Sequence, residues 1–495
     1  MSRPENDTES THSSILSDTP TESTPLLPGQ HQLYQTKSDI YDDNNGSWRG
    51  EFRWLFFNSL PVIGTYILQY SLQLASVFTL GHLGPTELAA SALASMFASV
   101  SAWSVAFGTA TALDTLCSQS WTAASDKTLV GIHLQRALVV LAIIFSIFIV
   151  PLWWNGTRIL LALNQEPELA LLAGAPAFIA FEGLKKYLQA QGIMRASTYV
   201  LLFASPLNFL INYALVHVES VRLGFIGAPI ATSLSYWLMF ILLVLYTWKV
   251  NGREAWGGWS MDAFRNWGPF LRLAIPGALM LCSEWWAFQL TALATGYLGG
   301  VNLASQSILL TTAGTAFQIP FAISIAAANR VGNALGEYYA LKAKRAAMIA
   351  LAFGVIAGLV NFLFFIYTRS TLAYIFTSDE EVVKNVSRVM PFCALFVISD
   401  AINGVSAGVI RGLGHQKVAA WISIGSNYIM ALPLAYVLTF PAGWGMTGIW
   451  VGLFIALTLS ATGQCIYVFA VNWNNEVDKI NYRVKAEEAQ MHDTH

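Results

Sequence analysis

One carboxylate stands out by its surroundings. Glu284 lies in the stretch LCSEWWAFQL (281–290), within a window from Leu271 to Leu298 that is otherwise almost free of charge. A carboxylate inside an apolar segment is costly, so it usually has a partner or a function. In such an environment the group favours its neutral form, and it can exchange a proton or neutralise a cationic ligand. Its role depends on the elements that position it.

Composition indicates a membrane protein. The chain has 495 residues, of which 55% are hydrophobic and only 11% charged, whereas soluble domains carry about 25% charged residues. The net charge of −2 gives no basic excess and therefore no indication of nucleic-acid binding. Apolar stretches of about 20 residues predict transmembrane helices. We expect an all-α integral membrane protein with twelve of them, at 55–79, 88–112, 131–153, 169–190, 198–217, 225–248, 270–297, 303–328, 346–367, 389–410, 418–440 and 446–471.

The distribution of basic residues predicts the orientation. If both termini are cytosolic, 22 of the 27 Lys and Arg residues fall in the tails and cytosolic connections, including span ends. Only five fall on the other side: Arg158, Arg222, Arg369, Lys384 and Arg388. This bias follows the positive-inside rule and supports both the span count and cytosolic termini. The sequons at Asn155 and Asn385 then lie in outer loops, as candidate glycosylation acceptors.

The chain contains one internal repeat. Shifted by 215 residues, Leu60-Pro61 meets Ile275-Pro276 and GHLG (81–84) meets GYLG (296–299) without a gap, and Gln69 meets Glu284. Six spans per repeat make the halves parallel, so a substrate site is expected near the midplane in a central cleft between two six-helix bundles. The predicted organisation is a disordered cytosolic tail (1–52), a first bundle (53–248), a cytosolic linker (249–268), a second bundle (269–472) and a cytosolic tail (473–495).

Seven motifs give a family resemblance. They are LGPTELAA (83–90), ALDTLCSQS (112–120), YLQAQG (187–192), PLNFLINYALV (206–216), LCSEWW (281–286), IPFAISIAAANRVGNALG (319–336) and DAINGVSAGVIRGLGHQ (400–416). In this order the chain resembles the multidrug and toxic compound extrusion (MATE) family, particularly its eukaryotic branch. The resemblance implies an ion-coupled exporter, in which protons or sodium enter as organic cations leave. Two departures, Trp121-Thr122-Ala123 and Asn329, leave the substrate open.

The resemblance also implies which side chains do the chemistry. In eukaryotic members a glutamate of the seventh span and an aspartate of the tenth are associated with proton and substrate binding, and the matching residues here are Glu284 and Asp400. Both lie near the middle of their expected spans. The first span offers Gln69 and no carboxylate, unlike some prokaryotic members. Further cleft-lining candidates are Tyr66, Gln69, Tyr70, Asn208, Trp285, Gln318, Asn427 and Tyr428, with Trp286 and Tyr297 as additional aromatic candidates.

These residues suggest an exchange rule. An organic cation binds best when the carboxylates are ionised, aromatic faces add cation–π attraction, and a proton arriving from the outer or luminal side competes for the same charge. Other charged residues have simpler roles. We expect Asp114 to serve as a cap or gate contact, Glu182 to pair locally with Lys185 and Lys186, and Arg411 to serve orientation. A structural hydrogen bond to Asn427 or Tyr428 is the alternative role of Asp400.

Several classes of protein lack support. There is no phosphate-binding loop for ATP and no catalytic or metal-ligand spacing, so we expect no enzyme, no cofactor and no metal. Three alternatives stay open: a flippase for lipid-linked or other amphiphiles, an uncoupled facilitator, and a binding or sensor protein. The segment Glu22–Leu27 (ESTPLL) has the form of an acidic dileucine signal for a sorting adaptor. It favours a vacuolar or lysosome-like membrane over the plasma membrane.

Overall fold

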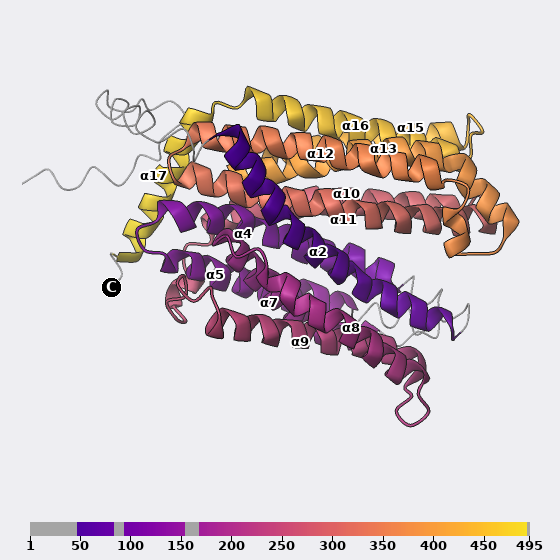
Figure 1. Ribbon diagram of the computed structural model, residues 1–495, viewed down its shortest axis with the longest axis horizontal. Helices are drawn as coiled ribbons and strands as arrows, with labels where there is room; N and C mark the ends of the chain where they lie inside the picture. Colours follow the sequence, from indigo (N-terminus) through magenta and orange to yellow (C-terminus); the bar gives the residue numbers. More distant parts are fainter. Residues whose placement is uncertain (1–46, 84–93, 154–167, 493–495) are drawn as a thin grey trace, which may run out of the picture. The chain divides into compact units, whose positions relative to one another are not determined.

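The computed structural model of the protein describes residues 47–83, 94–153 and 168–492. In these ranges the chain is helical apart from short connections, and no strand occurs in them (Figure 1). The expected sorting signal at Glu22–Leu27 and the sequon at Asn155 lie outside the described residues, as does most of the tail 1–52.

Six long helical segments form the first half. They are α2 (Trp48–Gly81), η1 (Ser99–Trp103) with α4 (Ser104–Ala123), α5 (Thr128–Ile144) with η2 (Phe145–Ile149), α7 (Glu168–Ala190), α8 (Ala196–His217), and η3 (Gly224–Ile226) with α9 (Gly227–Lys249). The connection 249–268 contains η4 (Met261–Phe264). It packs on α5, where Gln135 donates to the carbonyl of Gly258 and accepts from the amide of Ser260.

Six more long segments and a final helix form the rest. They are α10 (Gly268–Gly296), α11 (Gly300–Gly336), α12 (Ala340–Thr368) followed by η5 (Leu372–Ile375), α13 (Glu380–Leu413), α14 (Gln416–Ile424) with η6 (Gly425–Ala431) and α15 (Leu432–Thr439), α16 (Met446–Ala470), and α17 (Trp473–His492). In Figure 1 the helices α10 to α16 gather together, as do α5, α7, α8 and α9, while α2 runs between the two groups.

Helix α13 extends beyond its expected apolar range because a capping residue, and not hydrophobicity, fixes its start. The tenth span was expected at 389–410, whereas α13 starts at Glu380. Its N-cap Asp379 accepts from the amides of Glu381 and Val382, and its end at Gly414 takes a left-handed φ of 84°. Both are ordinary terminal motifs that need no apolar neighbours. The sequon at Asn385 therefore lies inside a helix instead of a loop.

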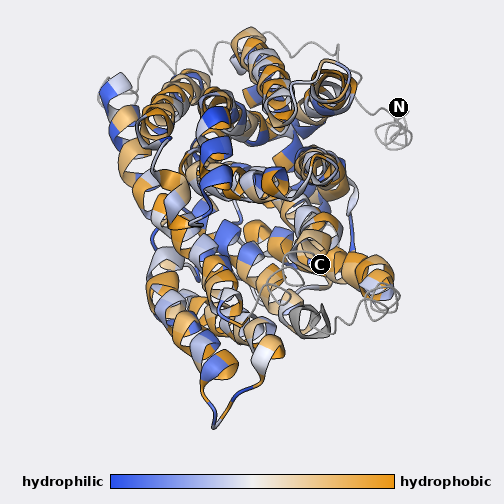
Figure 2. Cartoon of the chain, turned by 90° about the vertical axis from the view of Figure 1, so that its right-hand side faces the viewer, coloured by the Kyte–Doolittle hydropathy of each residue, from blue (hydrophilic) through white to orange (hydrophobic). Residues whose placement is uncertain are grey.

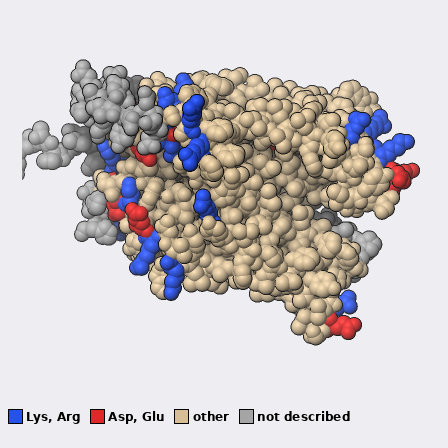
Figure 3. Space-filling model, in the orientation of Figure 1, with Lys and Arg blue, Asp and Glu red and all other residues tan. Residues whose placement is uncertain are grey.

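The helices fit a lipid environment. Within the described ranges, nine segments are long and apolar enough to cross a membrane. The three other long segments are α2, α7 and α10, which carry polar residues such as Gln69, Glu182 and Glu284. Hydrophobic residues run along nearly every helix in Figure 2, and large apolar side chains such as Phe148, Leu210 and Leu363 are exposed. On the face in Figure 3, charged residues gather toward the two ends and leave a broad uncharged belt. The chain is a multi-pass integral membrane protein.

Close helix contacts join the two halves. The helix α4 packs on α10 and α11, and α2 packs on α11. A Cβ on Gly108 would lie 2.4 Å from the Cα of Ala278, and one on Gly277 would lie 2.3 Å from Oγ1 of Thr111. Small residues of this kind let membrane helices approach closely and gain van der Waals contact. The α4–α10 contact therefore depends on its two glycines.

The C-terminal segment, expected to be a tail, is the helix α17. Its Val477, Ile480 and Val484 are buried in the same core cluster as residues of α11 and α12. Glu487 accepts a hydrogen bond from the buried Arg136 of α5, and Glu476 lies 3.0 Å from Nε2 of His415. Helix α17 therefore contacts elements of both halves.

Charge holds one end of α17 in place. Burial alone would raise the pKa of the Glu487 carboxyl, but the charges of His133, Arg136 and Arg483 outweigh burial and hold that pKa below its usual range. The carboxylate is thus stabilised in its ionised form by the folded structure.

Candidate functional site

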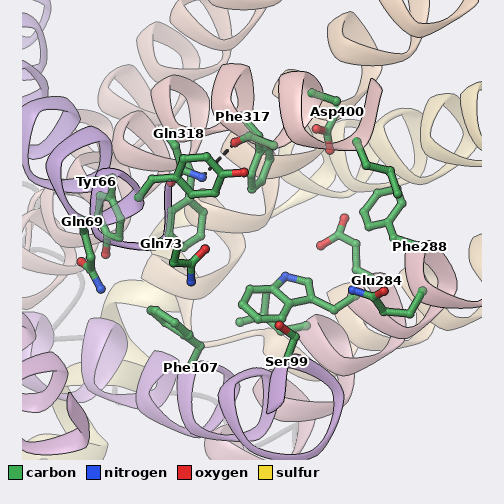
Figure 4. A pocket seen from close by; sticks show the side chains of 18 of the residues that line it. Tyr66, Gln69, Gln73, Ser99, Phe107, Glu284, Phe288, Phe317, Gln318 and Asp400 are labelled. Atoms are coloured by element: carbon green, nitrogen blue, oxygen red, sulfur yellow. Dashed lines mark hydrogen bonds between the residues drawn. The ribbon is translucent and has the colours of Figure 1, made fainter. Parts of the chain in front are cut away.

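A cavity of about 340 Å³ lies between α2, α4 with η1, α10, α11 and α13 (Figure 4). Two carboxylates line it, Glu284 and Asp400, together with four amides, Gln69, Gln73, Gln289 and Gln318. The remaining wall is mostly aromatic: Tyr66, Tyr70, Phe107, Trp285, Phe288, Phe317, Phe321 and Phe396. Elements of both halves thus enclose one chamber that combines carboxyl groups with aromatic ring surface.

Helical spacing explains how each element presents its residues. On α2 the lining residues are Tyr66, Gln69, Tyr70 and Gln73, at positions i, i+3, i+4 and i+7. Such residues share one face of an α-helix. The same rule places Glu284 beside Phe288 on α10, and Phe396 beside Asp400 on α13. Figure 4 shows the carboxyl groups of Glu284 and Asp400 on one side of the cavity and Tyr66 with Gln69 on the other.

Glu284 is held by a hydrogen bond from α13. Its Oε1 accepts from Nδ2 of Asn403 at 2.7 Å. The Oδ1 of Asn403 accepts from Ser460 Oγ at 2.7 Å and from Gln464 Nε2 at 3.0 Å. Because both donors occupy the carbonyl oxygen of the amide, the NH₂ group has to face the carboxylate. The network therefore fixes a donor toward Glu284, and a donor favours the ionised carboxylate.

Asp400 has no such support. Its side chain is 7% exposed, and among the described residues its carboxylate makes no hydrogen bond. The alternative of a bond to Asn427 or Tyr428 is therefore wrong for this structure. Neither Asp400 nor Glu284 forms an ion pair with Lys, Arg or His within the part of the chain that the structure describes. The two carboxyl groups therefore line the cavity without an ion-pair partner among the described residues.

The structure sorts the expected cleft residues into two groups. Tyr66, Gln69, Tyr70, Trp285 and Gln318 line the cavity with the two carboxylates. The expected residues Asn208, Asn427 and Tyr428 do not, and neither do Trp286 and Tyr297.

Each misplaced residue has a physical reason. Asn208 is buried where α8 packs on α9 and donates to Ser235 Oγ at 2.8 Å. Asn427 is buried in the π-helical turn η6. Tyr428 and Trp286 line a separate apolar cavity between α4, α5, α10 and α14, and Tyr297 is 87% exposed at the end of α10.

A buried ion-pair cluster lies behind the wall formed by Tyr66 and Gln69. Lys185 Nζ lies 2.7 Å from Glu182 Oε1, as expected, and donates to Gln69 Oε1 at 3.0 Å. The same ammonium lies 4.4 Å from the ring centroid of Tyr66. Gln69 in turn donates to Glu182 at 2.8 Å. The wall of the cavity is thus bonded to a charged pair, which orients the Gln69 amide.

One expectation about this cluster is wrong, and one residue has contacts beyond its expected role. Lys186 does not pair with Glu182, because its Nζ lies 2.7 Å from Asp114 Oδ1 on α4. Arg411 is not only an orienting residue, because it is buried, donates to Ser324, and lies 3.6 Å from Asp114 Oδ2. Asp114 therefore joins α4 of the first half to α13 of the second. Sequence spacing identifies partners on the same helix, and these partners lie on different helices.

Sequence analysis did not identify some of the site residues, although their helical spacing could have indicated them. Asn403 follows Asp400 by three residues and therefore lies on the same side of α13. Gln73 follows Gln69 by four residues, and Gln289 follows Glu284 by five. The ring pair Phe317 and Phe321 also has helical spacing. The usable signal was the presence of polar or aromatic residues about one helical turn from an expected site residue.

Comparison with known proteins agrees with this architecture. The family model MatE matches residues 61–214 and 276–437. The two matched segments begin 215 residues apart, the same offset as the internal repeat. Among solved structures, the crystal structure of the eukaryotic MATE transporter AtDTX14 has a TM-score of 0.82 and 29% identity, covering 88% of this chain and 99% of that one.

Curated relatives point to the same family. The chain is 40% identical over 450 residues to an uncharacterized transporter of Schizosaccharomyces pombe, and the match covers 89% of this chain and 83% of that protein. It is 36% identical over 468 residues to multidrug and toxin extrusion protein 2 of Oryctolagus cuniculus, covering 90% of this chain and 74% of that protein. The chain therefore belongs to the MatE family of transporters.

Proposed function

We propose that this protein is a secondary active transporter that exports organic cations, including xenobiotics, in exchange for protons by alternating access. The observation that carries the proposal is the cavity between the halves, where Glu284 and Asp400 face an aromatic wall and neither forms an ion pair with a cation of the described residues. The names of its relatives, which describe multidrug and toxin extrusion, support the substrate class. The twelve-span count and the division into two six-helix bundles belong to the same proposal.

The chemistry of the site favours a cation over other ligands. An unpaired carboxylate in a low-dielectric chamber attracts a positive charge strongly. Rings such as Trp285, Phe288 and Phe317 offer faces that attract a cation within about 6 Å of the ring centroid. A proton satisfies the same carboxylates without contacting the rings. Cation and proton therefore exclude one another, which is the requirement for exchange through one site.

The contacts between α4 and α13 support alternating access. Beside the Asp114–Arg411 pair, Thr115 Oγ1 donates to the carbonyl of Arg411 at 2.5 Å, and Gln119 Nε2 donates to the carbonyl of Gly412 at 2.8 Å. These bonds join the halves on the side where α17 lies. Opening the cavity toward that side requires them to break, so they act as a closed gate in this conformation.

Orientation and location follow from the same proposal. With cytosolic termini, α17 and the α4–α13 contacts lie on the cytosolic side, and protons enter from the other side. An acidic vacuolar or lysosome-like lumen would supply those protons, and the segment ESTPLL would direct the protein there through a sorting adaptor.

Direct competition between cation and proton tests the proposal. Binding of the fluorescent cation rhodamine 6G to the purified chain is measured in weakly buffered solution with a pH indicator. We expect binding to release protons from the wild type, and both binding and release to fall in Glu284→Gln and Asp400→Asn. The matched control Glu254→Gln, an exposed carboxylate of the linker, should behave as wild type. Binding without proton release between about pH 5 and pH 9, where a buried carboxylate would titrate, contradicts the proposal.

A further inference from the structure

A second polar cavity lies at the end of α12 and the start of α13. It has a volume of about 510 Å³ and is lined by Arg369, Lys384 and Arg388, with Ser370, Ser387 and Tyr374 among its other residues. We call these six residues the basic pocket. Helix α12 starts beside α17 and runs for 29 residues, so the basic pocket lies roughly 43 Å farther along it, at the opposite end of the molecule.

The cavity at the basic pocket carries a net positive charge, because three cations and one carboxylate, that of Glu380, line it. Lys384 and Arg388 are one turn apart on α13, and Arg369 is the C-cap of α12, so the three side chains converge from two helices. Among the described residues, none of the three side chains has a hydrogen bond or an ion pair. The carboxylate of Glu380, which also lines the cavity, accepts from the hydroxyl of Tyr374 and pairs with none of the three cations.

This concentration of positive charge differs from the distribution of Lys and Arg in the rest of the chain. Only five of the 27 Lys and Arg residues lie on the expected outer side, and three of those five line the basic pocket. Outer loops are normally poor in basic residues because positive charge favours the cytosolic side. A cluster at such a position has no role in orientation, so a ligand is the better explanation.

The surroundings indicate that the ligand is amphiphilic. Tyr367, Ile375 and Phe376 flank the basic pocket and are 91%, 79% and 48% exposed. Aromatic side chains at the ends of transmembrane helices mark the level of the lipid headgroups. Basic side chains at that level bind anionic headgroups, and the hydroxyls of Ser370 and Ser387 add donors suited to phosphate oxygens.

We propose that the basic pocket binds the phosphate group of an anionic phospholipid in the leaflet opposite α17. The headgroup phosphate contacts the three cations and the serine hydroxyls, and the acyl chains lie along the exposed apolar residues of α12 and η5. Under the orientation proposed above, this is the outer or luminal leaflet. The lipid site does not depend on the transported substrate.

Lipid binding to the purified full-length chain tests this proposal. The delipidated protein in neutral detergent is titrated with phosphatidylglycerol, and bound lipid per chain is counted by native mass spectrometry. Phosphatidylcholine and inorganic phosphate form separate arms. The test variant is Arg369→Gln/Lys384→Gln/Arg388→Gln. The matched control Arg253→Gln/Lys344→Gln/Lys417→Gln removes the same charge from exposed cations elsewhere. Thermal unfolding without lipid shows that each variant is folded.

The expected result is one tight phosphatidylglycerol per wild-type chain and per control chain. Since each basic residue near a lipid surface contributes a factor of about five in affinity, the test variant should bind it roughly 100-fold more weakly. Unchanged binding in the test variant, or an equal loss in the control, overturns the site. Equal binding of phosphatidylcholine overturns the role of charge, and competition by inorganic phosphate at lipid concentrations overturns the assignment to a lipid.

Discussion

The hydrogen bond from Asn403 to Glu284 sets how readily a proton displaces the cation. Asn403→Leu keeps the size of the side chain but removes the donor at 2.7 Å from the carboxylate. A hydrogen bond to a charged group contributes roughly 1.5 to 3 kcal/mol. This stabilisation belongs to the ionised form of Glu284, so its loss makes protonation easier. At about 1.4 kcal/mol per pH unit, the pH at which half of the cation is displaced should rise by about one to two units.

The assay is rhodamine 6G binding to the purified chain across a pH series. The matched control is Asn361→Leu, since Asn361 is also buried in the second half and donates to the carbonyl of Ala316 at 3.2 Å. This control loses a buried hydrogen bond without touching Glu284. It should therefore lower the thermal stability, as Asn403→Leu does, and leave the pH midpoint unchanged.

Two results would refute this reasoning. One is an unchanged midpoint in folded Asn403→Leu, which would mean that the Asn403 amide does not stabilise the ionised carboxylate. The other is an equal shift in Asn361→Leu, which would mean that general loosening of the second half moves the midpoint.

Three further outcomes follow from the packing. Arg136→Gln should lower the free energy of unfolding by roughly 3 to 5 kcal/mol, because it breaks the buried ion pair in which Arg136 donates to Glu487. Because the folded pKa of Glu487 is depressed, the stability difference between wild type and Arg136→Gln is complete above about pH 5 and is lost as the pH falls through that pKa. Thermal unfolding at several pH values measures this difference. A difference that does not depend on pH would contradict the prediction. Asn385 should carry no glycan, because its amide donates to α11 from inside a helix. In a variant without the sequon at Asn155, a shift in gel migration on endoglycosidase treatment would contradict this. Gly277→Val should destabilise by roughly 1 to 3 kcal/mol through the α4–α10 contact, whereas the control Gly296→Val, which meets open space, should unfold much as wild type does.

The membrane fold was predictable because it depends on local quantities. Apolar stretches define where helices lie in a bilayer, and every expected range overlaps a long helical segment of the structure. The repeat was also visible, since Leu60-Pro61 and Ile275-Pro276 stand at a constant offset that the two family-matched segments share. Helix ends were less predictable, as in α13, because a single capping residue such as Asp379 adds turns that carry no hydrophobic signal.

The site was predictable where helical spacing links residues to a recognised position. Glu284 and Asp400 were expected near the midplane, and the structure places both in one cavity. Contacts between helices were not predictable, because the rotation of each helix about its axis depends on packing. This explains why Asn208 faces α9 and why Lys186 reaches Asp114.

Helix α17 could not be predicted from the average composition of its segment. Its residues are polar overall, so the sequence interpretation placed a tail at 473–495. Yet Val477, Ile480 and Val484 recur at helical spacing, and the structure buries all three. A narrow apolar stripe of this kind suffices for a surface helix, and it is invisible to an average over the segment.

The proposed exchange requires the Glu284 carboxylate to couple proton and cation movement. The most direct measurement is proton-gradient-driven uptake of rhodamine 6G into vesicles that contain the purified chain, with wild type beside Glu284→Gln and the control Glu254→Gln. We predict that the gradient drives uptake in the wild type and the control and fails to drive it in Glu284→Gln. Equal gradient-driven uptake by all three proteins would contradict the claim.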